Sequence, residues 1–482
     1  MQTFERAPLE SGFLLAGEWI TAGQRVEINS PYTGRSIGNT WLGTKKDLDR
    51  AISNAENSSA ELRQIPAYKR KDALLSVAAK IGEHKETFVR LMALEAGKPI
   101  KAARAEVDRA VLTFTTAAEE AVRIYGEYMP LDFIAATAGR WAIVRRFPIG
   151  PVAGITPFNF PLNLVAHKLA PAMAAGCAVV LKPAPQTPFC ALLLGKLILE
   201  AGWPASSFSI LLLSNEDAAS LVADERLKLL SFTGSATVGW QLKRDAGKKR
   251  VVLELGGNAA VIVHRDADLE HAVARCTSGA FTYAGQSCIS VQRILVHADI
   301  FDEFTARMVE GAAKLRVGDP SDESTDVGPM IRASDVERVQ QWIKEATSSG
   351  AKVLCGGTSK GPLMMPTLLS ATTPKMKVNC EEIFAPLATI EPYKDFEDAL
   401  TRANDSQYGL QAGLFTHDSR LIFRAFERLE VGGVIVGDVP TFRVDPMPYG
   451  GVKDSGLGRE GIRYAIEEMT ERRLLVMANT PS

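Results

Sequence analysis

Cysteine is rare in this sequence, and long apolar segments are missing. The 482 residues contain six cysteines with no close pairs, which is typical of a reduced intracellular protein and argues against a disulfide scaffold. The longest apolar run, around Leu169 to Val180, is too short to cross a membrane and is flanked by lysines. The segment Met1 to Glu10 carries charges and no long apolar stretch, so we expect no secretory signal and a cytoplasmic protein.

An excess of either charge is also missing. Lys and Arg number 55 and Asp and Glu 56, so neither nucleic acid nor an anionic membrane is an expected partner. Hydrophobic residues make up 46% and charged residues 23%, the composition of a globular protein long enough for two or three domains. There is no Cys-x-x-Cys, His-Glu-x-x-His, Gly-x-Ser-x-Gly or Walker motif, and no metal site is expected.

Short apolar strands alternate with helices after Pro151, at a spacing of about 25 residues. This spacing predicts consecutive βαβ units, hence an α/β fold whose parallel sheet binds ligands at the carboxyl ends of its strands. The expected strands are Val152–Thr156, Cys177–Leu181, Ser207–Leu213, Leu227–Phe232 and Val251–Leu255. A second alternating series runs from Ala259 to about Val436.

Two segments do not belong to either series. Tyr125 to Arg146 is polar and aromatic and could form a strand-like arm after an amphipathic helix at about Ala102 to Arg123. Arg473–Met477 is typical of a strand but has no core of its own to join, so both segments suggest exchange between subunits. Gly456–Gly461 matches Gly-x-Gly-x-x-Gly, but it follows a polar segment rather than a strand, and a turn is expected there.

Cys288 is the candidate nucleophile. It follows the turn Gly285-Gln286-Ser287, which would hold a thiol at an exposed edge with backbone N–H groups nearby. Cys177, Cys276 and Cys355 lie in or beside apolar runs instead and are expected to be small core residues.

Other polar groups occur where predicted strands end. Glu254 ends an apolar strand, so it is either a paired structural carboxylate or a general base whose pKa is raised by burial. Asn159 could cap a helix or donate to an oxyanion. Lys182 could be merely solvated, whereas Phe232–Gly239 opens a helix whose free N–H groups favour a pyrophosphate.

Six motifs together resemble the aldehyde dehydrogenase superfamily over essentially the whole chain. The segment Pro440–Lys453 and the residues Tyr464–Met469 narrow the likeness to the branch that contains lactaldehyde, phosphonoacetaldehyde and non-phosphorylating glyceraldehyde-3-phosphate dehydrogenases. The six motifs are Pro157–Pro161, Leu181–Pro183, Phe232–Ser235, Leu253–Gly257, Gly285–Cys288 and Glu381–Pro386.

The resemblance implies a hydrolytic dehydrogenase. Cys288 would attack the aldehyde carbon, while the Asn159 amide and the Cys288 N–H hold the oxyanion. After hydride transfer to nicotinamide, Glu254 would activate water to hydrolyse the thioester to a carboxylate. Two alternatives remain: a coenzyme A-acylating enzyme, which usually lacks the carboxylate, and a non-catalytic binding or structural protein of the same fold.

The resemblance also implies NAD or NADP as cofactor. Pro185 stands where NAD-preferring members often carry Glu. Without that carboxylate the 2′-phosphate of NADP would not be repelled, so either cofactor is compatible with this position. Two other positions depart from the family pattern, since Ala385 and Gly437 replace the usual Gly and Asn. Lys182 and Glu382 would bind ribose hydroxyls. The implied cofactor contacts are Ile155, Thr156, Pro157, Phe158, Lys182, Pro185, Gly234, Ser235, Val238, Leu255, Glu382 and Phe384.

The implied fold has two doubly wound parallel-sheet domains and a bridging arm. Residues 1–124 and 149–251 would form the NAD(P)-binding domain, residues 252–446 the catalytic domain, and residues 125–148 and 466–482 the oligomerisation arm of a homodimer or homotetramer.

The expected substrate is a small aldehyde with an anionic or strongly polar tail. In anion-using relatives, the counterparts of the Arg109 helix and the Arg443 loop reach the aldehyde tunnel, and two guanidinium groups can grip a carboxylate, phosphonate or phosphate. Phe160 would make the inner tunnel apolar. The alternative is that both arginines are solvated.

Overall fold

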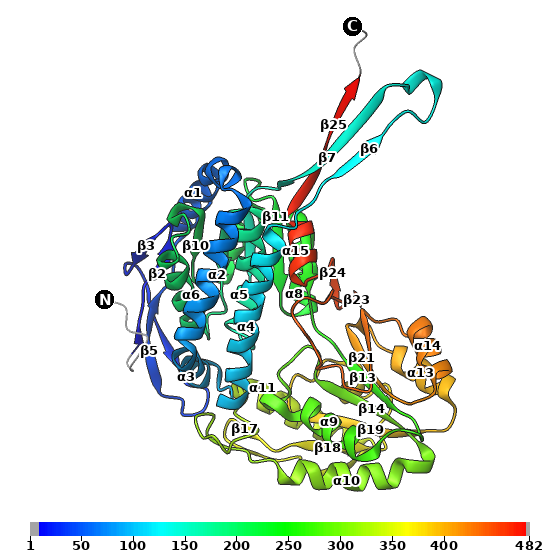
Figure 1. Cartoon of the computed structure of the whole chain (residues 1–482). Helices are drawn as coiled ribbons and strands as arrows, with labels where there is room; N and C mark the ends of the chain where they lie inside the picture. The colour runs from blue at the N-terminus through cyan, green and yellow to red at the C-terminus, as the bar shows by residue number, and fades with distance from the viewer. Residues whose placement is uncertain (1–8, 479–482) are drawn as a thin grey trace.

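Two helix-covered sheets and a projecting arm form the molecule (Figure 1). The computed structural model describes residues 9–478 of the chain. Residues 1–8 and 479–482 lie outside the described residues. They include most of the segment Met1 to Glu10, in which no secretory signal is expected, and the two ends of the predicted domain ranges. Within residues 9–478, no helix combines the length and the apolar character that crossing a membrane requires.

The first sheet contains all five strands predicted after Pro151. Its order is β24-β12-β11-β8-β9-β10-β2-β3, and β12, β11, β8, β9 and β10 are parallel. The chain passes from β8 through β9 to β10 and then returns to β11 and β12 on the other side of β8. This reversal places a crevice at the carboxyl ends of β8 and β11, where doubly wound sheets bind ligands. The bounds are β2 Phe13–Leu15, β3 Glu18–Ile20, β8 Val152–Ile155, β9 Val179–Lys182, β10 Phe208–Ile210, β11 Leu229–Thr233, β12 Arg250–Glu254 and β24 Gly456–Leu457.

β10 is shorter than predicted. It ends at Ile210 because its parallel partner β9 ends at Lys182, so beyond Leu211 no ladder hydrogen bonds remain. Leu211, Leu212 and Leu213 are buried all the same.

Helices cover the first sheet, and one of them, α5, is wholly buried. Every residue of α5 is buried, because α4 and α15 pack on it. The predicted helix at Ala102 to Arg123 is α4 and is therefore confirmed. The bounds are α1 Lys45–Gln64, α2 Ala67–Glu83, α3 Lys85–Ala96, α4 Ile100–Ala121, α5 Asn163–Ala175, α6 Pro188–Glu200, α7 Asn215–Ala223, α8 Ala236–Asp245 and α15 Ile462–Glu468.

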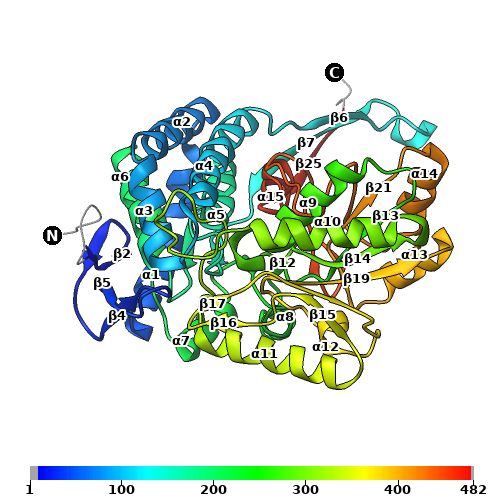
Figure 2. The same ribbon diagram turned by 90° about the horizontal axis from the view of Figure 1, so that it is seen from below.

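The second sheet has the order β15-β18-β19-β14-β13-β21-β22, parallel except for β15 (Figure 2). Val261 and Val263 of β13 face the core formed with α9, α10 and α11, whereas Ala260 and Ile262 face α13 and α14. The alternation along one strand therefore covers both faces. The bounds are β13 Ala259–Val263, β14 Val291–His297, β15 Lys352–Cys355, β18 Thr367–Ser370, β19 Leu387–Tyr393, β21 Gln411–Phe415, β22 Gly433–Val436, α9 Leu269–Phe281, α10 Phe301–Lys314, α11 Ala333–Ser348, α13 Phe396–Asn404 and α14 Ser419–Arg428.

Three strands form the arm: β6 Glu127–Pro130, β7 Arg140–Pro148 and β25 Thr470–Ala478. The tail strand predicted to lack a partner pairs with the chain's own β7 over its whole length, so that expectation is wrong. Its side chains are nevertheless exposed from Leu474 to Met477, by 41 to 59%. The arm therefore presents apolar surface and an unpaired edge away from the body.

Short elements complete the described chain. They are β1 Leu9–Glu10, β4 Arg25–Asn29, β5 Ser36–Trp41, β16 Ser359–Lys360, β17 Leu363–Met364, β20 Tyr408–Gly409, β23 Val452–Lys453, α12 Lys377–Cys380 and the 3₁₀ turns Ala135–Thr137, Ala205–Ser207, Thr282–Gly285 and Ala298–Ile300.

Candidate active site

A cavity of about 470 Å³ opens where β8, β11 and β12 end. Its wall includes all three candidate catalytic residues, Cys288, Glu254 and Asn159, together with Arg109, Phe160 and Arg443. Seven of the predicted cofactor contacts line it as well: Pro157, Phe158, Gly234, Ser235, Leu255, Glu382 and Phe384. The structure thus brings together residues that the sequence separates by more than 300 positions.

The loop before Cys288 is held in an unusual backbone conformation. Tyr283 and Ala284 have φ of 53° and Gly285 has φ of 64°, all in the left-handed region. Each such non-glycine residue costs about 1–3 kcal/mol, a cost that surrounding contacts must offset. The Tyr283 hydroxyl donates to the Ala96 carbonyl at 3.1 Å, and the Gln286 side chain bonds to three backbone groups. The loop therefore presents Cys288 rigidly.

The Cys288 sulfur lies between two oxygen atoms. Its thiol donates to Glu254 Oε1 at 3.3 Å, and the Tyr449 hydroxyl lies 3.2 Å away on another side. Desolvation by the cavity wall, and next the charge of Glu254, raise the pKa of the thiol well above its usual value. The thiol therefore needs a nearby base to become a nucleophile.

Glu254 has the properties of that base. It is the last residue of β12 and is fully buried. Burial, followed by repulsion from Glu460, raises its pKa to about 7. A carboxylate with this pKa exchanges protons near neutral pH, which is what general acid–base catalysis requires.

Asn159 lies in the wall of the same cavity as Cys288. One N–H of its amide donates to the Gln286 carbonyl at 3.1 Å, which leaves the second N–H available. The backbone N–H of Cys288 makes no hydrogen bond to any described residue. The alternative that Asn159 caps a helix is wrong, because α5 begins at Asn163 and Glu106 accepts from its first amides at 3.0 Å.

Two unpaired groups beside the cavity fit a nucleotide cofactor. The Thr156 hydroxyl follows β8, and Lys182 is the last residue of the adjacent strand β9. Both side chains are buried, and neither polar group has a hydrogen-bond partner among the described residues. Burial lowers the pKa of Lys182. Buried polar groups of this kind are rarely left without a partner, so both are suited to bind ribose or phosphate oxygens.

The start of α8 is open as well. No side chain caps its first amides, and Gly239 lets Leu255 approach so closely that a Cβ would meet Leu255 Cδ2 at 2.3 Å. Helix N-termini of this kind bind phosphate groups. Two further predicted cofactor residues lie in the wall of the same cavity. Burial raises the pKa of Glu382 to about 7. Phe384 has a φ of 50°, and its ring contacts Phe158 edge to face.

The remaining predicted cofactor residues lie outside this cavity. Ile155 and Thr156 are buried beneath it, Lys182 lies at the end of the neighbouring strand, and Val238 and Pro185 are exposed. Of the cysteines expected in the core, Cys177 and Cys276 are buried, and Cys355, on the edge strand β15, is partly buried and packs against the core of the second sheet.

Comparison with known proteins decides the family. The model of the aldehyde dehydrogenase family matches residues 19–475. This chain belongs to the aldehyde dehydrogenase family. It is 44% identical over 467 residues to the 3-sulfolactaldehyde dehydrogenase of Priestia aryabhattai, which covers 97% of this chain and 98% of that protein.

Solved structures of family members have the same fold as this chain over almost its whole length. Aldehyde dehydrogenase 21 of Physcomitrella patens, in complex with the reaction product succinate, has a TM-score of 0.95 at 44% identity, covering 97% of this chain and 98% of that chain. Glyceraldehyde-3-phosphate dehydrogenase GapN of Methanocaldococcus jannaschii, complexed with NADP, has a TM-score of 0.92 at 38% identity, covering 95% and 100%. Solved members similar to this chain hold NADP or NAD⁺, and this protein is an NAD(P)-dependent aldehyde dehydrogenase.

Both arginines of this aldehyde dehydrogenase are already bonded. Arg109 donates through Nη2 and Nε to Asp445 at 2.8 and 3.2 Å. The Arg443 side chain is only 7% exposed and pairs with Glu460 at 3.3 Å, so the alternative of a solvated residue is wrong for it. Its Nε has no partner among the described residues.

Several site residues escaped the sequence analysis. Lys168 Nζ contacts Glu460 at 2.5 Å and Thr233 at 2.8 Å, and all three side chains are buried. Burial alone would raise the pKa of Glu460, but Lys168 and Arg443 lower it to about 2. Glu460 lies in the Gly456–Gly461 segment, which forms β24 and a turn rather than a turn alone. In the sequence, only the position of Glu460 among three glycines could have indicated a special role for this carboxylate.

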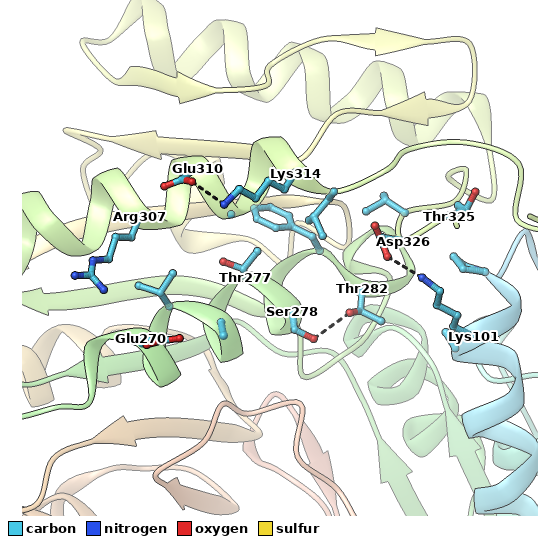
Figure 3. A pocket seen from close by; sticks show the side chains of 18 residues that line it. Lys101, Glu270, Thr277, Ser278, Thr282, Arg307, Glu310, Lys314, Thr325 and Asp326 are labelled. Atoms are coloured by element: carbon cyan, nitrogen blue, oxygen red, sulfur yellow. Dashed lines mark hydrogen bonds and ion pairs between the residues drawn. The ribbon is translucent and has the colours of Figure 1, made fainter. Parts of the chain in front are cut away.

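A second cavity, of about 590 Å³, lies between α9, α10 and the start of α4 (Figure 3). It contains none of the predicted site residues. Lys314 pairs with Glu310 and Lys101 with Asp326, while the Ser278 and Thr282 hydroxyls contact each other. Ser278 and Thr282 also line the first cavity, so the two cavities adjoin.

Proposed function

We propose that this aldehyde dehydrogenase oxidises a small aldehyde with an anionic tail, a carboxylate or sulfonate, to the corresponding acid. The observation that carries the proposal is the pair of arginines in the wall of the Cys288 cavity. Arg443 keeps Nε free and Arg109 keeps Nη1 free after their internal ion pairs, and a guanidinium has five N–H donors to share. The relatives named for sulfolactaldehyde and crystallised with succinate support the same class of tail.

Acylation begins at Cys288. Glu254 takes the thiol proton, and the sulfur attacks the aldehyde carbon to form a thiohemiacetal. The free N–H of Asn159 and the backbone N–H of Cys288 stabilise the oxyanion. A bound NAD(P)⁺ would supply the hydride acceptor, and loss of the hydride from the thiohemiacetal carbon would leave a thioester on Cys288.

Deacylation uses the same carboxylate after it has released the thiol proton to solvent. Glu254 removes a proton from water, the water oxygen adds to the thioester carbon, and the C–S bond breaks to release the acid. A buried carboxylate in contact with the sulfur supports hydrolysis rather than transfer to coenzyme A, because hydrolysis needs this base.

The cofactor is expected beside β8 and β9. Lys182 and Glu382 would hold the ribose hydroxyls, and the amides at the start of α8, with Gly234 and Ser235, the pyrophosphate. The division into an NAD(P)-binding domain, a catalytic domain and an arm is supported by the two sheets. The exposed apolar side chains of β25 support assembly into a homodimer or homotetramer, and six free cysteines support a cytoplasmic location.

A substrate panel tests the proposal. Arg109→Gln should raise KM for an anionic aldehyde by about tenfold or more, the worth of one charged hydrogen bond, and leave propanal nearly unchanged. Arg104→Gln is the matched control, because Arg104 lies on the same helix but pairs with Glu86 and Glu323 outside the cavity. Equal changes for both aldehydes would show that Arg109 is structural.

A further inference from the structure

Tyr449 lies against the candidate nucleophile in a fixed position. Its side chain is buried and packs on Ile289 and Leu410, and its backbone bonds to Glu460 in both directions, at 3.0 and 2.6 Å. Its hydroxyl lies 3.2 Å from Cys288 Sγ and has no other hydrogen-bond partner among the described residues. The hydroxyl is therefore directed at the sulfur alone.

Arg443 holds the ring from one face. Its guanidinium carbon lies 3.7 Å from the centre of the Tyr449 ring, a close cation–π contact. The same guanidinium is tied to Glu460, which is in turn bonded to Lys168. Because Glu460 also bonds to the Tyr449 backbone, ring and cation belong to one connected unit.

The direction of the hydrogen bond follows from the other groups. The thiol hydrogen of Cys288 is directed to Glu254, so the sulfur accepts from Tyr449. Burial raises the pKa of Tyr449 well above its usual value, so the phenol stays protonated and remains a donor. Once Glu254 has taken the thiol proton, the thiolate can only accept, and the phenol can only donate.

We propose that Tyr449 is a catalytic residue that donates a hydrogen bond to the Cys288 thiolate, and that Arg443 is a positioning residue that holds the Tyr449 ring. The proposal rests on the proposed function in one respect, that Cys288 is the nucleophile. In acylation the thiol proton moves to Glu254, and a sulfur electron pair forms the C–S bond. In deacylation that bond breaks and its electron pair returns to sulfur, where Tyr449 again stabilises the thiolate.

Other charges that face the thiol act alongside Tyr449. Glu254 from β12 and Glu382 from the loop after α12 raise the pKa of Cys288 when ionised, whereas Arg443 lowers it. Lys168 and Glu460 lie behind Glu254. Tyr449→Phe removes only the hydroxyl and leaves all of these charges in place.

Alkylation of the full-length enzyme measures the thiolate without any aldehyde. The rate of iodoacetamide labelling at Cys288 is followed against pH by peptide mass spectrometry, which separates it from labelling at the partly buried Cys355 and Cys380. Tyr449→Phe should raise the apparent pKa of Cys288 by about one unit, so that labelling below that pKa is about tenfold slower. The same comparison of Tyr449 with Phe at this position is repeated in the Glu254→Gln variant, so that the titration of Glu254 does not contribute to the pH dependence.

Tyr393→Phe is the matched control. Tyr393 is a buried tyrosine of β19 whose hydroxyl contacts His264 at 2.9 Å, outside the Cys288 cavity, so the pKa of Cys288 should not change. Arg443→Met should shift the pKa of Cys288 upward, and Arg443→Lys should restore part of the shift.

A folded Tyr449→Phe variant with an unchanged pKa of Cys288 would overturn the proposal. If that variant does not fold, Tyr449→3-fluorotyrosine, a nearly isosteric and stronger donor, should lower the pKa of Cys288, and an unchanged value overturns the proposal as well. Failure of the underlying function would look different. Cys288→Ala would then remain active, whatever Tyr449 does.

Discussion

Glu254→Gln separates the two halves of the reaction. The substitution keeps the size of the side chain and its contact with the Cys288 sulfur, 3.3 Å in the native protein, but removes the ability to accept a proton. General-base catalysis contributes about 10²–10⁴-fold, so steady-state turnover should fall by at least about a hundredfold. Acylation and hydride transfer should survive better, because a small thiolate fraction suffices for one turnover. One equivalent of reduced cofactor should therefore form before turnover stalls.

The assay is rapid mixing of enzyme, cofactor and aldehyde, with the absorbance of the reduced nicotinamide recorded over time. In the native enzyme, turnover limited by hydrolysis should increase with pH through about 7, because the base must be deprotonated and burial raises the pKa of Glu254 to about 7. This pH dependence should disappear in the Glu254→Gln variant.

Glu95→Gln is the matched control. Glu95 is fully buried, and burial raises its pKa to about 7 too, but its carboxylate accepts from the Phe189 and Cys190 amides at the start of α6. Its replacement should lower stability without changing the ratio of burst to steady state. If Glu254→Gln loses the burst together with steady-state turnover, the loss of Cys288 activation accounts for the effect, and the reasoning that Glu254 acts chiefly in hydrolysis is refuted.

Three further predictions concern the nucleophile, the cofactor and the arm. Cys288→Ala should abolish turnover while cofactor affinity, measured by fluorescence titration, stays nearly intact; residual turnover above a few per cent would contradict the assignment. Pro185→Glu should weaken the binding of NADP more than that of NAD, since a carboxylate repels the 2′-phosphate; an equal loss of affinity for both would show that Pro185 is not near the 2′ oxygen. Leu475→Asp, in the exposed strand of the arm, should dissociate the proposed homo-oligomer in sedimentation experiments, and an oligomer of unchanged mass would exclude β25 from its interface.

Local pattern was sufficient for much of the fold. The five strands of the first sheet follow from short apolar runs at regular spacing, because parallel strands buried on both faces need continuous apolar residues. Cys288 and Glu254 could also be selected locally, since a thiol after a tight turn and a carboxylate at the end of an apolar strand are each unusual. Their contact at 3.3 Å joins the end of β12 in the first sheet to the loop before β14 in the second sheet, and the sequence indicated it only through the family resemblance.

The ion-pair partners of buried charged side chains could not be predicted from the local sequence pattern. Lys168 and Glu460 are 292 positions apart, and apart from the glycines around Glu460 nothing in either neighbourhood indicates a buried ion pair. Arg443 could be a solvated residue of a turn by its sequence, but its guanidinium is buried between Glu460 and the Tyr449 ring. The tail strand could have belonged to another subunit, and it pairs with β7 of its own chain.

The sequence by itself determined the elements, the order of the two sheets along the chain and the chemical types at the strand ends, because these depend on periodicity and on neighbours within a few residues. Only the tertiary structure decided which charges neutralise one another and which polar atoms stay free, at Thr156, Lys182 and Arg443. The physical reason is that burial makes an unpaired charge costly, so each buried charge depends on a partner that the fold, and not the local sequence, supplies.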